Sequence, residues 1–127
     1  MSPEQHIQQA QRRIDHADVM MAEATQLDDI AAQLMAVQRY WGAPNRQPHL
    51  TAALADSRAV WHGIQTALAE GTLELPLEVQ HNLLILSVYA DSKICACEIA
   101  PSIEGLSSLI ALTRTLAGSL KEWRVAA

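Results

Sequence analysis

One residue pair in this chain has the spacing of a metal site: Glu78 and His81, three positions apart. Carboxylate-bridged di-metal bundles use two Glu-x-x-His motifs together with two further inward carboxylates, and this chain contains a single such motif. The alternative is a solvent-facing first helical turn, in which Glu78 lies favourably near the positive end of the helix dipole. The sequence favours that alternative, so we expect neither a bound metal nor another cofactor.

The other reactive residue types do not form a catalytic set. None of the five histidines has a second histidine at i, i+4, the spacing that helical metal ligands use. Cys95 and Cys97 would point about 200° apart on a helix, so they cannot bond to each other, and we expect one buried and one half-exposed thiol. Glycine-rich phosphate loops and nucleophile-elbow motifs are missing from the sequence. We therefore expect a protein-binding module and not an enzyme.

Charge narrows the classes of partner. The chain has 14 acidic and 9 basic residues, a formal net charge of −5, and its one adjacent basic pair, Arg12 and Arg13, sits among acids. Because phosphate neutralisation dominates nucleic-acid affinity, direct binding to nucleic acid is not expected. The main apolar run is too short to span a membrane, and the first residues do not resemble a signal peptide. We expect a cytoplasmic protein with reduced thiols and no membrane partner.

A long N-terminal helix is predicted over residues 3–41. Its apolar residues repeat at intervals of three and four from Ile7 to Ala24, which forms a narrow seam of the coiled-coil type. The three-and-four spacing of the apolar residues is interrupted between Thr25 and Asp28. Either one long helix drifts in phase there or the helix breaks, and we favour one continuous helix. Residues 1–24 either pack this seam on the rest of the fold or form an arm that dimerises or holds a partner.

Three more helices are predicted after the Gly- and Pro-containing break at residues 42–48. The second should cover residues 49–70, with Gly71 at its C-terminal cap position. The fourth should cover residues 103–123, with Ser102 as its N-cap. Since each predicted helix carries an apolar face, we predict a single-domain, all-α four-helix bundle that comprises residues 1–127.

The third helix, over about residues 76–99, is the most apolar segment. Pro76 suits a helix start, and the four consecutive apolar residues 83–86 cover the whole helix circumference. A helix that is apolar on every side must be covered by neighbours on most sides. A buried strand over residues 83–89 is the competing interpretation, but the length of the pattern favours helix. We therefore expect this helix at the centre of the bundle.

Three stretches carry a family resemblance through their order and spacing. They are residues 58–61 (Arg-Ala-Val-Trp) with 68–69 (Leu-Ala), then 75–76 (Leu-Pro) with 82–89, and finally 109–120, which includes Arg114. Together they resemble the FlaF family of flagellar biosynthesis regulators of α-proteobacteria. The resemblance covers about residues 50–121, and the first 40 residues fit only loosely. His81, Asp91 and Thr113 depart from the residue types usual in the family, which affects the contacts expected of those positions but not the fold.

The resemblance implies a cytoplasmic protein needed for flagellum assembly, one that promotes flagellin synthesis or export alongside or opposite a second regulator, FlbT. Unassembled flagellin exposes apolar helical ends, so a chaperone-like, helix-in-groove contact with flagellin is the expected mechanism. The alternative is an oligomeric helical adaptor that dimerises through the N-terminal helix without binding flagellin. Aromatic residues are enriched in binding hot spots. The candidate partner-binding residues are Tyr40, Trp41 and Trp123, together with Arg58 and Arg114 at positions matched to the family. The alternative for the three aromatic residues is that they seal the ends of the bundle. The alternative for the two arginines is that they form ion pairs within the protein.

Overall fold

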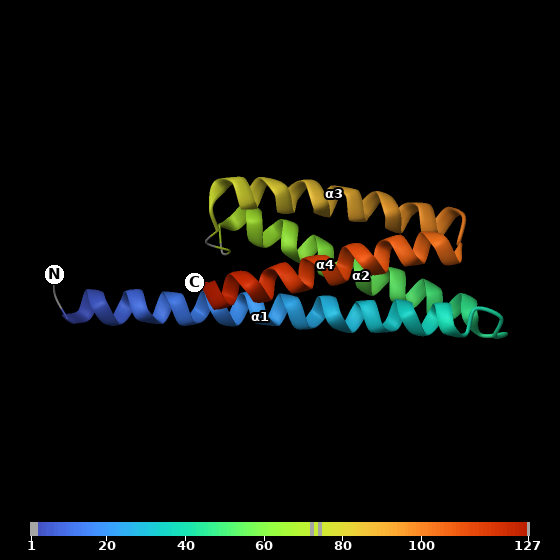
Figure 1. The fold of residues 1–127 in the computed structure, drawn as a ribbon, viewed down its shortest axis with the longest axis horizontal. Helices are drawn as coiled ribbons and strands as arrows, with labels where there is room; N and C mark the ends of the chain where they lie inside the picture. Colours follow the sequence, from blue (N-terminus) through green and yellow to red (C-terminus); the bar gives the residue numbers. More distant parts are fainter. Residues whose placement is uncertain (1–2, 72, 74, 127) are drawn as a thin grey trace.

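The structure is a computed structural model that describes the backbone of residues 3–71, 73 and 75–126 and the side chains of residues 21–71, 73 and 75–122. Its elements are four helices: α1 (Pro3–Arg39), α2 (Arg46–Glu70), α3 (Leu77–Ile99) and α4 (Ile103–Ala126). They pack side by side as a bundle (Figure 1). The predicted all-α four-helix bundle is therefore confirmed.

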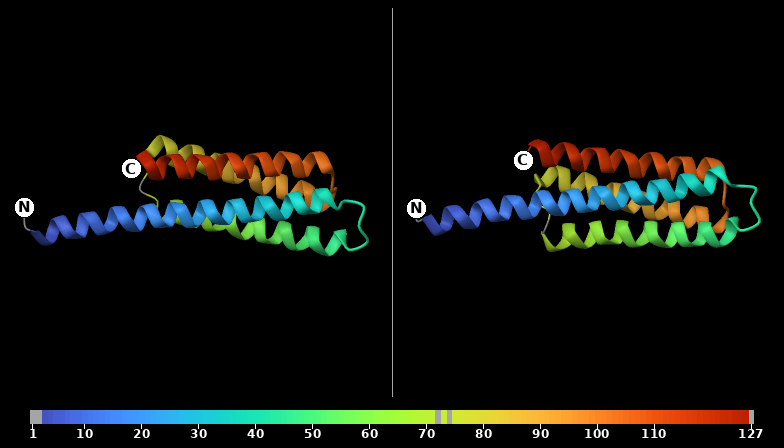
Figure 2. Two further views of the ribbon diagram at one scale, coloured as in Figure 1. Left: turned by 60° about the horizontal axis from the view of Figure 1, so that its bottom comes forward. Right: turned by 90° about the horizontal axis from the view of Figure 1, so that it is seen from below.

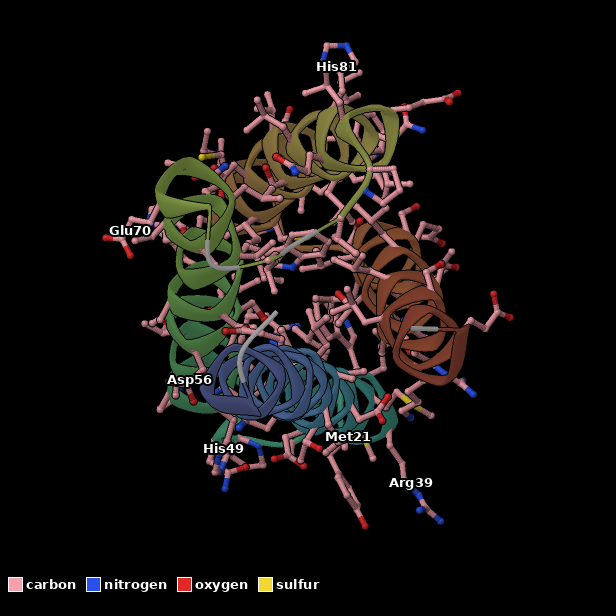
Figure 3. All side chains as sticks on the ribbon, turned by 90° about the vertical axis from the view of Figure 1, so that its left-hand side faces the viewer. Met21, Arg39, His49, Asp56, Glu70 and His81 are labelled. Carbon is pink, nitrogen blue, oxygen red and sulfur yellow. The ribbon has the colours of Figure 1, made fainter. Side chains whose placement is uncertain are left out.

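Each helix has two neighbours. α1 packs on α2 and α4, and α3 packs on the same two helices from the opposite side. The view along the bundle places the helices at four corners, with α1 and α3 on a diagonal (Figure 3). Such an arrangement leaves every helix with an inner face and an outer face.

The inner faces form one apolar core to which all four helices contribute. Its largest side chain is Trp61 on α2, which is completely buried and belongs to the same cluster as aliphatic residues of all four helices. Burying one of these aliphatic side chains contributes roughly 1.5–3 kcal/mol. The core side chains with almost no exposed surface are Leu27, Leu34, Leu50, Trp61, Ile64, Leu73, Leu83, Ile94, Leu106, Leu109, Leu116 and Leu120.

The expected central position of α3 is wrong. Its buried residues are Leu83, Ser87, Ala90, Ile94 and Cys97, which lie along one side of the helix only. Three of the four consecutive apolar residues at 83–86 are therefore not in the core, and two of them are exposed. The run does cover the circumference of the helix, but a bundle with two neighbours per helix covers only part of that circumference.

α1 is one continuous helix across the interruption of its apolar spacing. Thr25 does not cap a restarted helix, because its hydroxyl donates to the Met21 carbonyl 2.9 Å away, within the same helix. The first turns of α1 extend past the ends of the other three helices (Figures 1 and 2). Most of the seam from Ile7 to Ala24 lies outside the described side chains, apart from exposed Met21 and buried Ala24.

Two of the predicted helix boundaries are confirmed in detail. Gly71 ends α2 in the left-handed conformation, at φ 72°, and its N–H donates to the carbonyls of Ala67 and Leu68. Ser102 begins α4, because its hydroxyl oxygen accepts a hydrogen bond of 2.9 Å from the N–H of Gly105. α2 begins at Arg46, three residues before the predicted start. Boundaries set by local capping chemistry were thus readable from the sequence.

Candidate partner-binding surface at the α1–α2 turn

The turn between α1 and α2 is held by short-range backbone hydrogen bonds. The Ala43 N–H donates to the Tyr40 carbonyl over 2.9 Å, and the Arg46 N–H donates to the Ala43 carbonyl over 3.1 Å. These bonds fix the direction in which the aromatic pair Tyr40 and Trp41 leaves the end of α1. The two rings consequently have different surroundings.

Trp41 lies half-buried against the end of the core. The Arg46 guanidinium covers its ring at 4.3 Å from the centroid, a cation–π contact of ordinary geometry. Trp41 therefore seals this end of the bundle, which was one of its two expected roles. Arg46 was not among the predicted site residues, although its position within the Gly- and Pro-containing break at residues 42–48 placed it near the aromatic pair.

Tyr40 points away from the core and is 63 % exposed. It stands between two hollows, of about 510 and 630 Å³, and lines both of them together with Ala36. The first hollow lies between α1 and α2, and the second lies between α1 and the start of α4. We call Tyr40 and the residues lining these two hollows the Tyr40 surface.

Small side chains create the first hollow. Its floor includes Ala36 and Val37 of α1 and Ala52 and Ala53 of α2, so the two helix backbones are separated by little side-chain volume here. Polar groups form its rim, where the Asn45 amide nitrogen lies 3.1 Å from Nε2 of the histidine at position 49. An apolar floor with a few polar groups at the rim is the usual composition of a ligand pocket, and the volume falls in the usual range.

The second hollow is more open and is supported by a side-chain bridge. The Gln38 amide donates to the Ile103 carbonyl over 2.9 Å and to the Ser107 hydroxyl over 2.7 Å, which ties α1 to the first two turns of α4. Met35 and Ile103 supply exposed apolar walls next to Tyr40. The two hollows together form a concave apolar surface around one protruding tyrosine.

The predicted arginines do not join this surface. Arg58 on α2 forms an ion pair of 2.5 Å with Glu98 on α3, and its guanidinium also lies 3.5 Å from the Cys95 sulfur. The hydrogen bond that the Arg58 guanidinium donates to the Glu98 carboxylate is the main reason that the pKa of Arg58 is raised. Arg114 is exposed on α4, away from Arg58, and among the described residues its side chain has no ion-pair partner. The side chain of Trp123 lies outside the described residues.

The alanines of the Tyr40 surface were missed by the sequence reasoning. In a sequence, a small residue on a helix indicates only a weak core position. The hollow forms because Ala36 of one helix lines it together with Ala52 and Ala53 of another. An available signal was the run of small residues at positions 52, 53 and 55, near the start of α2, beside the aromatic pair.

Metal chemistry finds no support in the described part of the chain. Glu78 and His81 are both exposed, and His81 points away from the bundle (Figure 3). No group of three or more His, Cys, Asp or Glu side chains among the described residues could hold a metal ion. The sequence analysis expected one buried and one half-exposed thiol; Cys97 is buried, but Cys95 is exposed, and neither forms a disulfide. Burial raises the pKa of the Cys97 thiol, which disfavours its thiolate.

The fold and this surface define a class: a small all-α bundle with a concave apolar surface at one end. None of the helices, within the residues that the structure describes, is long and apolar enough to cross a membrane. A family model described as flagellar protein FlaF matches residues 5–120, and the chain therefore belongs to the FlaF family. The match also includes α1, which extends the resemblance beyond residues 50–121. Searches of curated proteins and of solved structures found no match.

Proposed function

We propose that this protein is a regulator of flagellum assembly in the cytoplasm, and that it acts as a chaperone-like protein that binds flagellin. Membership of a flagellar protein family supports a flagellar role. The observation that carries the binding proposal is the Tyr40 surface, where an exposed aromatic side chain stands between two apolar hollows. An amphipathic helix from unassembled flagellin would insert its apolar residues into these hollows.

The same surface accounts for the rest of the proposal. Binding through apolar hollows needs no catalytic group, metal or cofactor, so the protein would be a binding protein and not an enzyme. A net charge of −5 disfavours direct contact with messenger RNA, so any effect on flagellin synthesis would pass through flagellin or through an FlbT-type regulator. We also propose that the protein comes from an α-proteobacterium, as the resemblance of its sequence implies.

Isothermal titration calorimetry with purified flagellin tests the proposal. The wild-type protein should bind at micromolar concentration, and Tyr40→Ala should weaken binding at least about tenfold, because an anchoring aromatic at the centre of an interface contributes more than 1.4 kcal/mol. Tyr89→Ala is the matched control, since Tyr89 is a second exposed tyrosine, on α3. Absence of binding by the wild-type protein, or equal effects of the two substitutions, would refute the proposed site.

The alternative function is an oligomeric adaptor that dimerises through the seam from Ile7 to Ala24. The extension of the first turns of α1 past the other helices favours keeping this candidate (Figure 2). Ile14→Glu places a charge in the middle of the seam and should then convert a dimer into a monomer in sedimentation velocity. An unchanged mass would remove the adaptor from consideration.

A further inference from the structure

The outer side of α3 is the largest concentration of exposed apolar side chains among the described residues. α3 carries six of the ten large apolar residues that are exposed, and α2 carries none. Leu77 and Ile99, at the two ends of α3, are 82 % and 85 % exposed, and Val88 at its middle is 59 % exposed. Because a helix turns 100° per residue, these three positions lie within about 40° of one another, on the side opposite the core.

This outer side carries little charge. We define the α3 face as the outward positions 77, 81, 84, 85, 88, 89, 92, 95, 96 and 99, none of which is Asp, Glu, Lys or Arg. Glu78, which is exposed in the first turn of α3, is the charged residue that lies on the same side. The charged residues of α3 beyond its first turn lie at the sides and have partners. Glu98 pairs with Arg58, Asp91 accepts from the Gln65 amide, and Lys93 lies 5.3 Å from the ring centroid of Tyr89. An ordinary solvent-facing helix side would carry such charges at its centre.

The spacing of the α3 face is the same in both directions along the helix. Its central line runs through positions 77, 81, 84, 88, 92, 95 and 99, at intervals of 4, 3, 4, 4, 3 and 4 residues, so Val88 is its midpoint. An antiparallel copy centred on Val88 would place Leu77 of one copy opposite Ile99 of the other. The apolar ends would then meet each other and Val88 would meet its own copy, while Leu84 would lie opposite Ser92. Each of these contacts would occur twice, as in any twofold interface.

We propose that the α3 face is a self-association surface on which a second copy of this chain docks in antiparallel orientation, with the twofold axis at Val88. The low charge of the α3 face offers a charged partner few groups to bind, whereas a second copy offers a surface of the same apolar composition. Antiparallel helices also bring opposite ends of their dipoles together. The proposal is independent of flagellin binding, because the α3 face and the Tyr40 surface share no residue.

The size of the face predicts a weak dimer. A helix of 23 residues is about 35 Å long, and one helix face of that length is at the low end of the area that specific interfaces bury. Each copy carries a net charge of −5, so the two copies repel each other outside the contact. Salt screens this repulsion and leaves the apolar contact intact, so the dimer should become tighter as salt is added.

Sedimentation velocity of the full chain, at concentrations up to about 100 µM, tests the proposal. We expect a monomer–dimer equilibrium that shifts toward dimer at higher salt. Val88→Glu places two like charges together at the axis and should raise the dissociation constant at least about tenfold. Ala59→Glu adds the same charge to an exposed position of α2 and should leave the equilibrium unchanged, and circular dichroism should show both variants folded.

Disulfide trapping tests the orientation. In a Cys95→Ser background, Val88→Cys should form a covalent dimer under mild oxidation, since position 88 meets itself at the axis. The wild-type Cys95 should not cross-link, because an antiparallel pair places it opposite His81. A strictly monomeric protein, a dimer that is insensitive to Val88→Glu, or wild-type cross-linking through Cys95 would each overturn the proposal.

Discussion

The Tyr40 surface and the α3 face both expose apolar side chains, but they differ in shape and in rim. The Tyr40 surface is concave, because alanines line its hollows and a single tyrosine rises between them. The α3 face is convex, because large aliphatic side chains stand outward along a whole helix. A hollow accepts individual side chains of another protein, whereas a convex apolar helix face is suited to lie along another helix. The two surfaces are therefore suited to different partners.

The helices beneath the two surfaces share one apolar core. Trp61 on α2 is the largest side chain of that core and is completely buried, so both surfaces depend on the core in which it packs. Its indole N–H has no hydrogen-bond partner among the described residues, so its contribution comes from volume and not from a polar contact.

The largest expected effect is that of a core substitution, which should destabilise the fold that carries both surfaces. Trp61→Ala should lower the free energy of unfolding by about 3–5 kcal/mol, because it leaves a large cavity in the core. Urea denaturation followed by circular dichroism would measure the loss. Trp41→Ala should cost clearly less, since Trp41 is only half-buried. Equal losses for the two tryptophans would contradict the assignment of Trp61 as the principal core residue.

A substitution that fills the hollows should separate the two surfaces. Ala36 lines both hollows and is exposed, so Ala36→Leu adds volume where a partner side chain would insert, without disturbing the core. Calorimetry should show flagellin affinity reduced by about tenfold or more, equivalent to about 1.4 kcal/mol. Sedimentation should show self-association unchanged. If Ala36→Leu alters the dimer and not flagellin binding, the roles of the two surfaces are reversed.

Substitution of the half-buried Glu23 on α1 should change the stability of the protein without changing the Tyr40 surface or the α3 face. Burial raises the pKa of Glu23, and one of its carboxylate oxygens is buried without a hydrogen-bond partner in the described structure. At pH values between the Glu23 pKa of the unfolded state and that of the folded state, the native state binds more protons than the unfolded state. The free energy of unfolding therefore falls as the pH rises through the folded-state pKa. Glu23→Gln should therefore raise the free energy of unfolding at pH 7, by less than about 1 kcal/mol because solvent screens this partly exposed group.

The pH dependence provides the check on Glu23. The gain from Glu23→Gln should shrink as pH falls below the folded pKa toward the ordinary value of 4.5, because the wild-type carboxyl is then protonated as well. Urea denaturation at several pH values measures this. A gain that stays constant with pH would show that the ionisation of Glu23 is not its cause.

The smallest expected effect concerns the ion pair between α2 and α3. Arg58 and Glu98 are both partly exposed, so Arg58→Ala should lower the free energy of unfolding by no more than about 1 kcal/mol. A double-mutant cycle with Glu98→Ala isolates the pair, and its coupling should weaken with added salt. The predicted dimer should respond to salt in the opposite direction. A strong effect of Arg58→Ala on flagellin affinity would instead show that Arg58 belongs to the partner-binding surface.

Local features of the fold were predictable, and the assembly of the helices was not. Gly71 and Ser102 marked helix ends because capping depends on a few adjacent residues. The residues at 83–86 were correctly identified as apolar all round, but the pattern does not specify how many neighbours a helix has. The sequence therefore predicted a buried centre where the structure has an exposed face.

At the candidate site, too, the local feature was predictable from the sequence and the arrangement across helices was not. Tyr40 was selected from its residue type and its place at a helix end, and the structure puts it at the edge of two hollows. The alanines that make those hollows come from two helices and face each other only in the folded bundle. The pairing of Arg58 with Glu98 joins residues 40 positions apart, and sequence reasoning could name it only as one of several alternatives.

Sedimentation velocity of the protein mixed with flagellin, at concentrations where the protein alone is dimeric, tests most directly whether the two surfaces act separately. The account predicts a complex of two copies of this chain with two flagellins, and a one-to-one complex of unchanged affinity when Val88→Glu replaces the wild type. A one-to-one complex with the wild-type protein, together with loss of flagellin binding by Val88→Glu, would show that one surface serves both partners and would contradict the account.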